Sequence, residues 1–195
     1  MNTLKILIAC EYSGIVRDEF ITKGHDAMSC DLLPTESPGP HYQGDVFDII
    51  NDGWDMMIAH PPCTDIAVSG AAWFKQKIAD GRQQKALEFV KCLMNAPIPR
   101  ICIENPVSVI SSKIRKPDQI IQPWMFGHET TKTTCLWLKN LSLLIPTNIV
   151  GKGERKTYAS GKSSPLWHAN SGGGCGHTRS KTYQGIAAAM ADQWA

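Results

Sequence analysis

The sequence predicts an α/β fold with a mostly parallel sheet, and two observations support this prediction. Short apolar runs of strand length alternate with segments that have the apolar spacing of helices, and turn-forming or polar residues follow each run. The 43% hydrophobic and 19% charged fractions are ordinary for a folded chain. With 195 residues, we expect a single domain over residues 1–195, large enough to bury a full core.

The apolar runs end at polar, proline or turn residues, as buried strands of such a sheet do. We predict strands at residues 4–10, 26–30, 54–59, 100–103 and 134–138, and a short further unit that closes at Gly44, Asp45 and Val46. Apolar residues at helical spacing predict helices at residues 15–23, 79–96 and 187–194. In the second helix, Ala86, Phe89, Val90 and Leu93 share one face.

Residues 151–182 differ in composition from the rest of the chain. They are rich in Gly, Ser, Lys and Arg, so we expect a mobile, basic and glycine-rich loop within the domain. The net charge of only +2 excludes a global basic field, but basic residues cluster at 113–116, 152–156 and 179–181. These clusters are either solvated loops or contacts to phosphates, and the sequence leaves both interpretations open.

The sequence carries none of the patterns of a membrane or secreted protein. No apolar run approaches the length of a bilayer span, and the first residues lead into a strand without a signal-peptide pattern. Seven cysteines, an odd number that lie mostly in apolar patterns, predict a reducing cytoplasm and no disulfides. His168, Cys175 and His177 lack the spacing of a structural zinc site, so we expect no metal.

Chemistry-bearing residues follow two of the predicted strands. The string His60-Pro61-Pro62-Cys63-Thr64 comes after the strand at 54–59, and Glu104-Asn105-Pro106 comes after the strand at 100–103. The carboxyl ends of strands form the sites of open α/β sheets, so a thiol and a carboxylate would share one pocket. A thiol nucleophile beside a carboxyl acid suits attack on an electron-poor ring carbon. The alternatives are a buried structural thiol for Cys63 and a helix-capping or surface carboxylate for Glu104.

The first predicted turn, residues 11–14, has a single glycine and is therefore not a full dinucleotide fingerprint. Asp31 lies 17 residues beyond Gly14, at the end of the second strand, where a carboxylate is placed to bind ribose hydroxyls. Asp45, at the end of the next unit, could accept from an adenine amino group. These residues favour a nucleoside-containing ligand without a pyrophosphate. The alternative is that both aspartates cap turns.

Four motifs together resemble those of the cytosine-5 DNA methyltransferases. Tyr12-Ser13-Gly14-Ile15 resembles the Phe-Ser-Gly-Ile core of their first motif, and Gly44-Asp45-Val46 is similar to their Gly-Asp-Ile. Pro61-Pro62-Cys63 resembles their catalytic Pro-Pro-Cys, and Glu104-Asn105-Pro106 their Glu-Asn-Val. The whole chain is most similar to the small single-domain enzymes of phages and prophages, whose later segments resemble residues 132–138 and 180–186.

The resemblance implies a Rossmann-like S-adenosylmethionine-dependent fold with helices on both faces of the sheet and a reduced target-recognition region. It implies addition of Cys63 to carbon 6 of cytosine while Glu104 holds or protonates ring nitrogen 3, and then methylation at carbon 5. Because the target carbon is inaccessible in a stacked duplex, the cytosine of the DNA partner must be flipped out or single-stranded. The expected location is the cytoplasm of a bacterial host or a phage-infected cell.

The resemblance also assigns the remaining site residues. The expected cofactor-binding residues are Tyr12, Ser13, Gly14, Ile15, Asp31, Asp45, Val46 and Pro61. The expected substrate-binding residues are Pro62, Thr64, Asn105 and Lys132. Thr64 stands where the family has glutamine, and Lys132 is the nearest basic candidate for an absent Gln-x-Arg-x-Arg motif. The pair Trp73-Phe74, in the polar stretch after Cys63, is a candidate for stacking on a base.

Other functions remain open at this point. An amino-group DNA methyltransferase carries an Asp/Ser/Asn-Pro-Pro-aromatic loop at the same strand end, although Cys63 and Glu104 count against it. A catalytically idle DNA-binding or anti-restriction module would keep the fold and bind without turnover. RNA or a free nucleotide could replace DNA, and a modified donor could transfer a larger group. Neither the recognition sequence nor the oligomeric state follows from the sequence.

Overall fold

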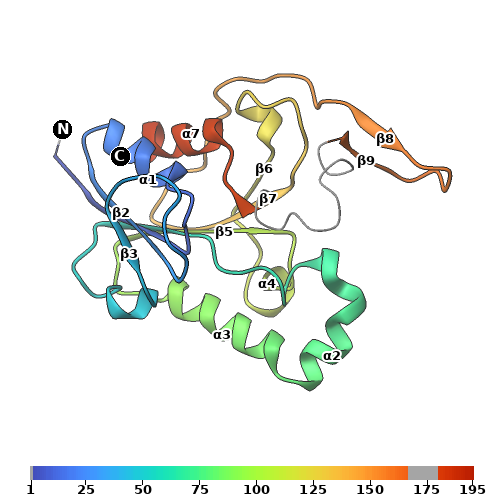
Figure 1. Cartoon of the computed structure of the whole chain (residues 1–195), viewed down its shortest axis with the longest axis horizontal. Helices are drawn as coiled ribbons and strands as arrows, with labels where there is room; N and C mark the ends of the chain where they lie inside the picture. The colour runs from blue at the N-terminus through green and yellow to red at the C-terminus, as the bar shows by residue number, and fades with distance from the viewer. Residues whose placement is uncertain (1, 167–179) are drawn as a thin grey trace.

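The computed structural model describes residues 2–166 and 180–195, and its centre is a seven-stranded sheet with the strand order β3-β2-β1-β4-β5-β7-β6 (Figure 1). The strands are β1 (Lys5–Ala9), β2 (Asp26–Asp31), β3 (His41–Gln43), β4 (Met56–Ala59), β5 (Arg100–Pro106), β6 (Gln119–Ile121) and β7 (Thr134–Lys139). The first five strands run parallel, and β7 is antiparallel to both β5 and β6. The predicted mostly parallel α/β sheet is therefore confirmed.

Helices cover both faces of the sheet (Figure 1). They are α1 (Ile15–Thr22), α2 (Phe74–Ala79), α3 (Arg82–Met94), α4 (Ile110–Lys113) and α7 (Gln184–Trp194), with short 3-10 helices η1 (Val46–Asp48), η2 (Val68–Trp73) and η3 (Pro123–Met125). Neighbouring residues of a strand face opposite sides of the sheet. Leu7 and Met57 accordingly pack with the α3 side, and Ile6 and Met56 pack with α1 and α7. Burial on both faces explains why these strands are continuous apolar runs.

The predicted helix at 79–96 corresponds to α3, which begins at Arg82 and ends at Met94, and the preceding helix α2 was not predicted. Gly81 adopts a left-handed φ of 78°, which ends the helical path between α2 and α3. The side chain of Asp80 then accepts a hydrogen bond from the backbone nitrogen of Arg82 at 3.1 Å and starts α3. Of the predicted apolar face, Val90 and Leu93 are buried and Ala86 and Phe89 are half-buried, and Leu87, which was not predicted, is buried beside them.

The segment 151–182, predicted as a loop, contains regular structure in its first half. Strands β8 (Arg155–Thr157) and β9 (Ser163–Pro165) form a two-stranded antiparallel hairpin. Residues 167–179 lie outside the described part of the chain, and so do His168, Cys175 and His177. Mobility of this segment stays a prediction. None of the helices in the described ranges has the length and apolar character that a membrane crossing needs.

Candidate active site

The site candidates converge where the strand order reverses. Strand β1 lies between β2 on one side and β4 on the other, and ligands of open α/β sheets bind at the carboxyl ends beside such a reversal. Cys63 follows β4, and Glu104 lies in β5. These strands pair in parallel with Ala59 opposite Ile103. The loop that carries Cys63 therefore leaves the sheet next to Glu104.

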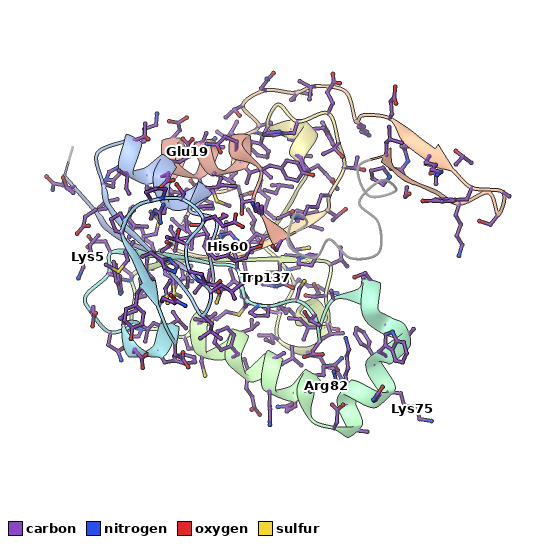
Figure 2. All side chains as sticks on the ribbon, in the orientation of Figure 1. Lys5, Glu19, His60, Lys75, Arg82 and Trp137 are labelled. Atoms are coloured by element: carbon purple, nitrogen blue, oxygen red, sulfur yellow. The ribbon has the colours of Figure 1, made fainter. Side chains whose placement is uncertain are left out.

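Two side-chain hydrogen bonds join the loop after β4 to strand β5. Asn105, which is only 1% exposed, donates from Nδ2 to the carbonyl oxygen of Pro61 at 2.8 Å. Nδ1 of His60 lies 3.1 Å from Oε2 of Glu104. The backbone nitrogen of His60 also donates to the carbonyl of Ala9 at 2.9 Å, which ties the same loop to β1. Figure 2 shows His60 near the middle of the molecule.

Glu104 is held as a carboxylate. Burial alone would raise its pKa, but the hydrogen bond from His60, together with the charges of His60 and Lys132, brings the pKa below its ordinary value. The Glu104 side chain is 16% exposed, so one side of it remains open to a ligand. In the free protein Glu104 can therefore accept hydrogen bonds at neutral pH. A ring nitrogen that hydrogen-bonds to this carboxylate must carry a proton, either its own or one taken up on binding.

The loop around Cys63 is braced on both sides. The carbonyl of Cys63 accepts from the backbone nitrogens of Ile66 at 3.1 Å and Ala67 at 2.8 Å, which closes a tight turn. The backbone nitrogen of Val109 donates to the carbonyl of Ile66 at 3.0 Å and links the turn to the loop after β5. Lys77 of α2 donates to the carbonyl of Thr64. Cys63 itself is a half-buried thiol outside any disulfide.

The turn after β1 is built around a buried carboxylate that the sequence interpretation overlooked. Glu11, 5% exposed, accepts from the backbone nitrogens of Val16 at 2.8 Å and Arg17 at 3.3 Å, and so caps α1. Gly14 has a φ of 77°, and a Cβ atom there would lie 2.9 Å from Cβ of Ser37. Only glycine fits this conformation and this contact.

The two aspartates of the predicted cofactor half both cap turns. Oδ1 of Asp31 accepts from the backbone nitrogen of Leu33 at 2.9 Å, and Oδ1 of Asp45 accepts from that of Phe47 at 3.0 Å. Each keeps a second carboxylate oxygen for a ligand. Burial is the main reason that the pKa of the Cys10 thiol is raised to about 12. The negative charge of Asp31, and more weakly that of Asp45, adds to this increase. Asp31 ends β2, which pairs with β1 so that Cys30 lies opposite Ala9.

Residues Ser180 to Thr182 lie over the turn after β1. The hydroxyl of Tyr12 is 2.7 Å from Oγ of Ser180, and Nζ of Lys181 is 2.6 Å from a carboxylate oxygen of Glu36. Nζ of Lys132 donates to the carbonyl of Lys181 at 3.3 Å. The cavity between this segment, the turn and His60 measures about 60 Å³. A second cavity, of about 560 Å³, lies between α3 and β7, away from Cys63.

The other predicted residues divide between the two sides of this site. Ser13 and Val46 are buried and support their turns, Ile15 is half-buried at the start of α1, and Pro61 is buried beneath the Cys63 loop. Pro62 and Thr64 are exposed beside Cys63, and Trp73 is 64% exposed on η2. In the described ranges no cluster of three potential metal-ligating side chains occurs.

His60 is the functional candidate that sequence reasoning missed. Its position directly before Pro61 was visible, but its partner Glu104 is 44 residues away. Only the pairing of β4 with β5 brings the two together. Nε2 of His60 is buried and makes no hydrogen bond within the described part of the chain.

No protein-family model and no curated protein matches the chain. Among solved structures, one similar chain is described as a DNA modification methyltransferase encoded within a prophage of Escherichia coli, at 18% identity and a TM-score of 0.52. Another is the methyltransferase EhMeth of Entamoeba histolytica, at 15% identity and a TM-score of 0.51. The matches cover 76% and 79% of this chain but only 52% and 58% of those chains. The protein has the Rossmann-like α/β fold that these two structures share.

Proposed function

We propose that this protein transfers a methyl group from S-adenosylmethionine to carbon 5 of cytosine in DNA. The observation that carries the proposal is the bond from Asn105 to the carbonyl of Pro61, which couples the Pro-Pro-Cys loop to the Glu-Asn pair of the next strand. The fold shared with two solved methyltransferases supports methyl transfer, and the prophage protein's description supports DNA as the substrate.

In this proposal Cys63 adds as a thiolate to carbon 6 of the cytosine ring, forming a carbon–sulfur bond. Glu104 binds the amino group and ring nitrogen 3, and a proton at nitrogen 3 draws electrons away from carbon 6. Carbon 5 would then take the methyl group and lose its proton to water, nitrogen 3 would release the proton that it had taken up, and the bond between carbon 6 and the sulfur would break to release the thiolate. His60 orients Glu104 through Nδ1 and acts as a positioning residue.

S-adenosylmethionine would supply the methyl group. The residues beside the end of β1 fit it, because the second oxygens of Asp31 and Asp45 suit the ribose hydroxyls and the adenine amino group. A cavity of about 60 Å³ is too small for such a ligand, since ligand pockets measure roughly 300–1,000 Å³. In this proposal the cofactor would extend beyond this cavity over Asp31 and Asp45, which do not line it.

The cytosine must leave the base stack to reach Cys63. Pro62 and Thr64 are exposed beside the thiol and would contact the extruded base or its backbone. Lys132, whose charge already acts on Glu104, would meet the phosphate or the ring from the β7 side.

The test is covalent trapping on DNA that contains 5-fluorocytosine. Fluorine at carbon 5 blocks the final elimination, so the wild-type protein with cofactor should form an adduct that survives denaturing electrophoresis. Cys63→Ser should abolish this adduct while cofactor binding persists. The matched control is Cys92→Ser, which removes an exposed thiol on α3 and should leave the adduct intact.

Nucleoside mass spectrometry of the reacted DNA then locates the methyl group. A methyl group on an exocyclic nitrogen, or full activity of Cys63→Ser, would contradict the covalent mechanism and favour amino-group methylation. Binding of DNA and cofactor without any turnover would instead favour an idle binding module.

A further inference from the structure

The β8–β9 hairpin projects from the body of the protein, on the same side of the view as α2 (Figure 1). All residues from 151 to 163 are exposed. An isolated two-stranded hairpin is at best marginally stable in water, so something at its base must order it. The β8–β9 hairpin has no apolar core of its own, so burial of apolar side chains does not explain why it is ordered.

The base of the hairpin is anchored to the loop before β7. Gly153 approaches the backbone so closely that a Cβ atom would lie 1.8 Å from the carbonyl oxygen of Glu129. Arg155 donates from one guanidinium nitrogen to Oγ1 of Thr131 at 3.3 Å and from another to the carbonyl of Ser163 at 3.0 Å. The arm is therefore set at a defined position on the body.

The two faces of the hairpin have different roles. Side chains alternate along a strand, and Arg155 is paired opposite Pro165 on the face that holds the anchor. Lys156 is paired opposite Ser164 on the other face. Tyr158 shares this second face, because its hydroxyl lies 3.0 Å from Oγ of Ser164 and Nζ of Lys156 lies 5.8 Å from its ring centre.

We define the outer face of the hairpin as Lys156, Tyr158, Ser164 and, by the same alternation, Lys162. Residues 151–166 contain four basic side chains and one acidic side chain, whereas the whole chain has a net charge of only +2. The remainder of the protein is thus close to neutral, and its excess positive charge is concentrated on this arm. The chemistry of the outer face is two ammonium groups around a tyrosine and a hydroxyl.

We infer that the outer face of the β8–β9 hairpin enters a groove of duplex DNA beside the target base. The inference rests on the proposed function for its substrate. The major groove of B-form DNA admits a two-stranded ribbon, lysines meet its phosphates, and the hydroxyls of Tyr158 and Ser164 suit base edges. The hairpin would then supply the recognition that the chain otherwise lacks room for.

The experiment measures the affinity for a mixed-sequence DNA duplex over a range of salt concentrations. The double variant Lys156→Ala with Lys162→Ala should reduce the slope of log affinity against log salt by about two units, one for each lost phosphate contact. The control, Lys85→Ala with Lys91→Ala, removes the same charge from exposed positions on α3 and should leave the slope unchanged. Lys156→Arg with Lys162→Arg should restore the wild-type slope.

A second measurement uses an RNA duplex in place of the DNA duplex. The major groove of A-form RNA is too narrow for side chains to read, so the alanine pair should matter much less there. An equal loss on both duplexes would overturn entry into the groove. Tight, salt-dependent DNA binding by the alanine pair would overturn the inference altogether and leave the face to a protein partner.

Methylation of a single-stranded oligonucleotide separates this inference from the proposed function. The alanine pair should retain wild-type turnover on that substrate, because no groove is present. If the wild-type protein methylates no DNA at all, the proposed function fails. If it methylates DNA and the alanine pair binds duplex as the wild type does, only the hairpin inference fails.

Discussion

The cofactor half and the base half of the candidate site use their polar side chains in different ways. In the cofactor half, Asp31 and Asp45 each accept from a backbone nitrogen two residues further along the chain. In the base half, the bonds from His60 to Glu104 and from Asn105 to Pro61 each join residues 44 apart. One half is assembled from local turns, and the other depends on the pairing of β4 with β5.

This difference predicts that function and stability are coupled in the base half of the site and largely separate in the cofactor half. A local turn keeps its shape when one ligand-binding oxygen is lost, so mutations in the cofactor half should affect mainly binding. The bonds of the base half hold two loops together and also orient the reacting groups. Mutations there should affect turnover, folding or titration, and four experiments test this division.

The largest effect is expected for Glu104→Gln. The amide keeps the shape but loses the charge, and a positioned acid or base contributes about 10²–10⁴-fold to rate. We expect turnover to fall by that factor while the affinity for S-adenosylmethionine, measured by calorimetry, is unchanged. A comparable loss of cofactor affinity would mean that the two halves are not separable.

Asp31→Ala should have the converse effect. Loss of a hydrogen bond from a ribose hydroxyl to a charged oxygen costs about 1.5–3 kcal/mol, which corresponds to a roughly 10- to 100-fold weaker affinity for the cofactor. Calorimetry should show this loss, and urea unfolding should show a smaller cost, about 0.5–1.5 kcal/mol, because alanine also removes the hydrogen bond from the backbone nitrogen of Leu33. Asp26→Ala, an exposed position at the start of β2, serves as the control. Unchanged affinity would remove Asp31 from the cofactor site.

Asn105→Ala tests the stability of the base half. The variant leaves the carbonyl of Pro61 without the donor that Asn105 provides, at a cost of about 1–3 kcal/mol in the free energy of urea unfolding. Asn95→Ala removes a similar amide bond, to the carbonyl of Lys91, from an exposed helix end and should cost far less. Equal costs would show that the bond from Asn105 to Pro61 stabilises the protein no more than an exposed hydrogen bond does.

The smallest effect is a shift in pH dependence on removal of His60. Because the pKa of Glu104 is lowered in the folded protein, its carboxylate contributes stability above the unfolded pKa, and this contribution is lost as the pH falls through the folded value. His60→Ala removes the donor and so raises the folded pKa. The variant should therefore lose this contribution at a higher pH than the wild type.

Urea unfolding from neutral pH into the range below 4.5, the ordinary pKa of Glu104, measures this shift. Glu104→Gln serves as the control, because it has no group that titrates there and should lack the step. Identical pH profiles for His60→Ala and the wild type would remove His60 as the positioning partner of Glu104.

Much of the fold could be predicted from the sequence, because burial on both faces makes central strands continuous apolar runs. Strands β1, β2, β4, β5 and β7 lie where such runs predicted them. The edge strand β3 ends directly before Gly44, where the sequence predicted that a short further unit closes. The edge strand β6 was not predicted, since a strand of three residues has no distinctive apolar pattern. The hairpin β8–β9 was missed for the same reason, because its order comes from the anchor at Gly153 and Thr131.

The sequence by itself determined which chemical groups stand at the strand ends, namely Cys63 after β4 and Glu104 in β5. Strand ends follow from local apolar pattern and turn residues, so their polar residues can be assigned without a partner. The tertiary structure alone decided that His60 meets Glu104 and that Asn105 meets Pro61. Those contacts depend on the register that sets Ala59 opposite Ile103, and register arises from the packing of the whole sheet.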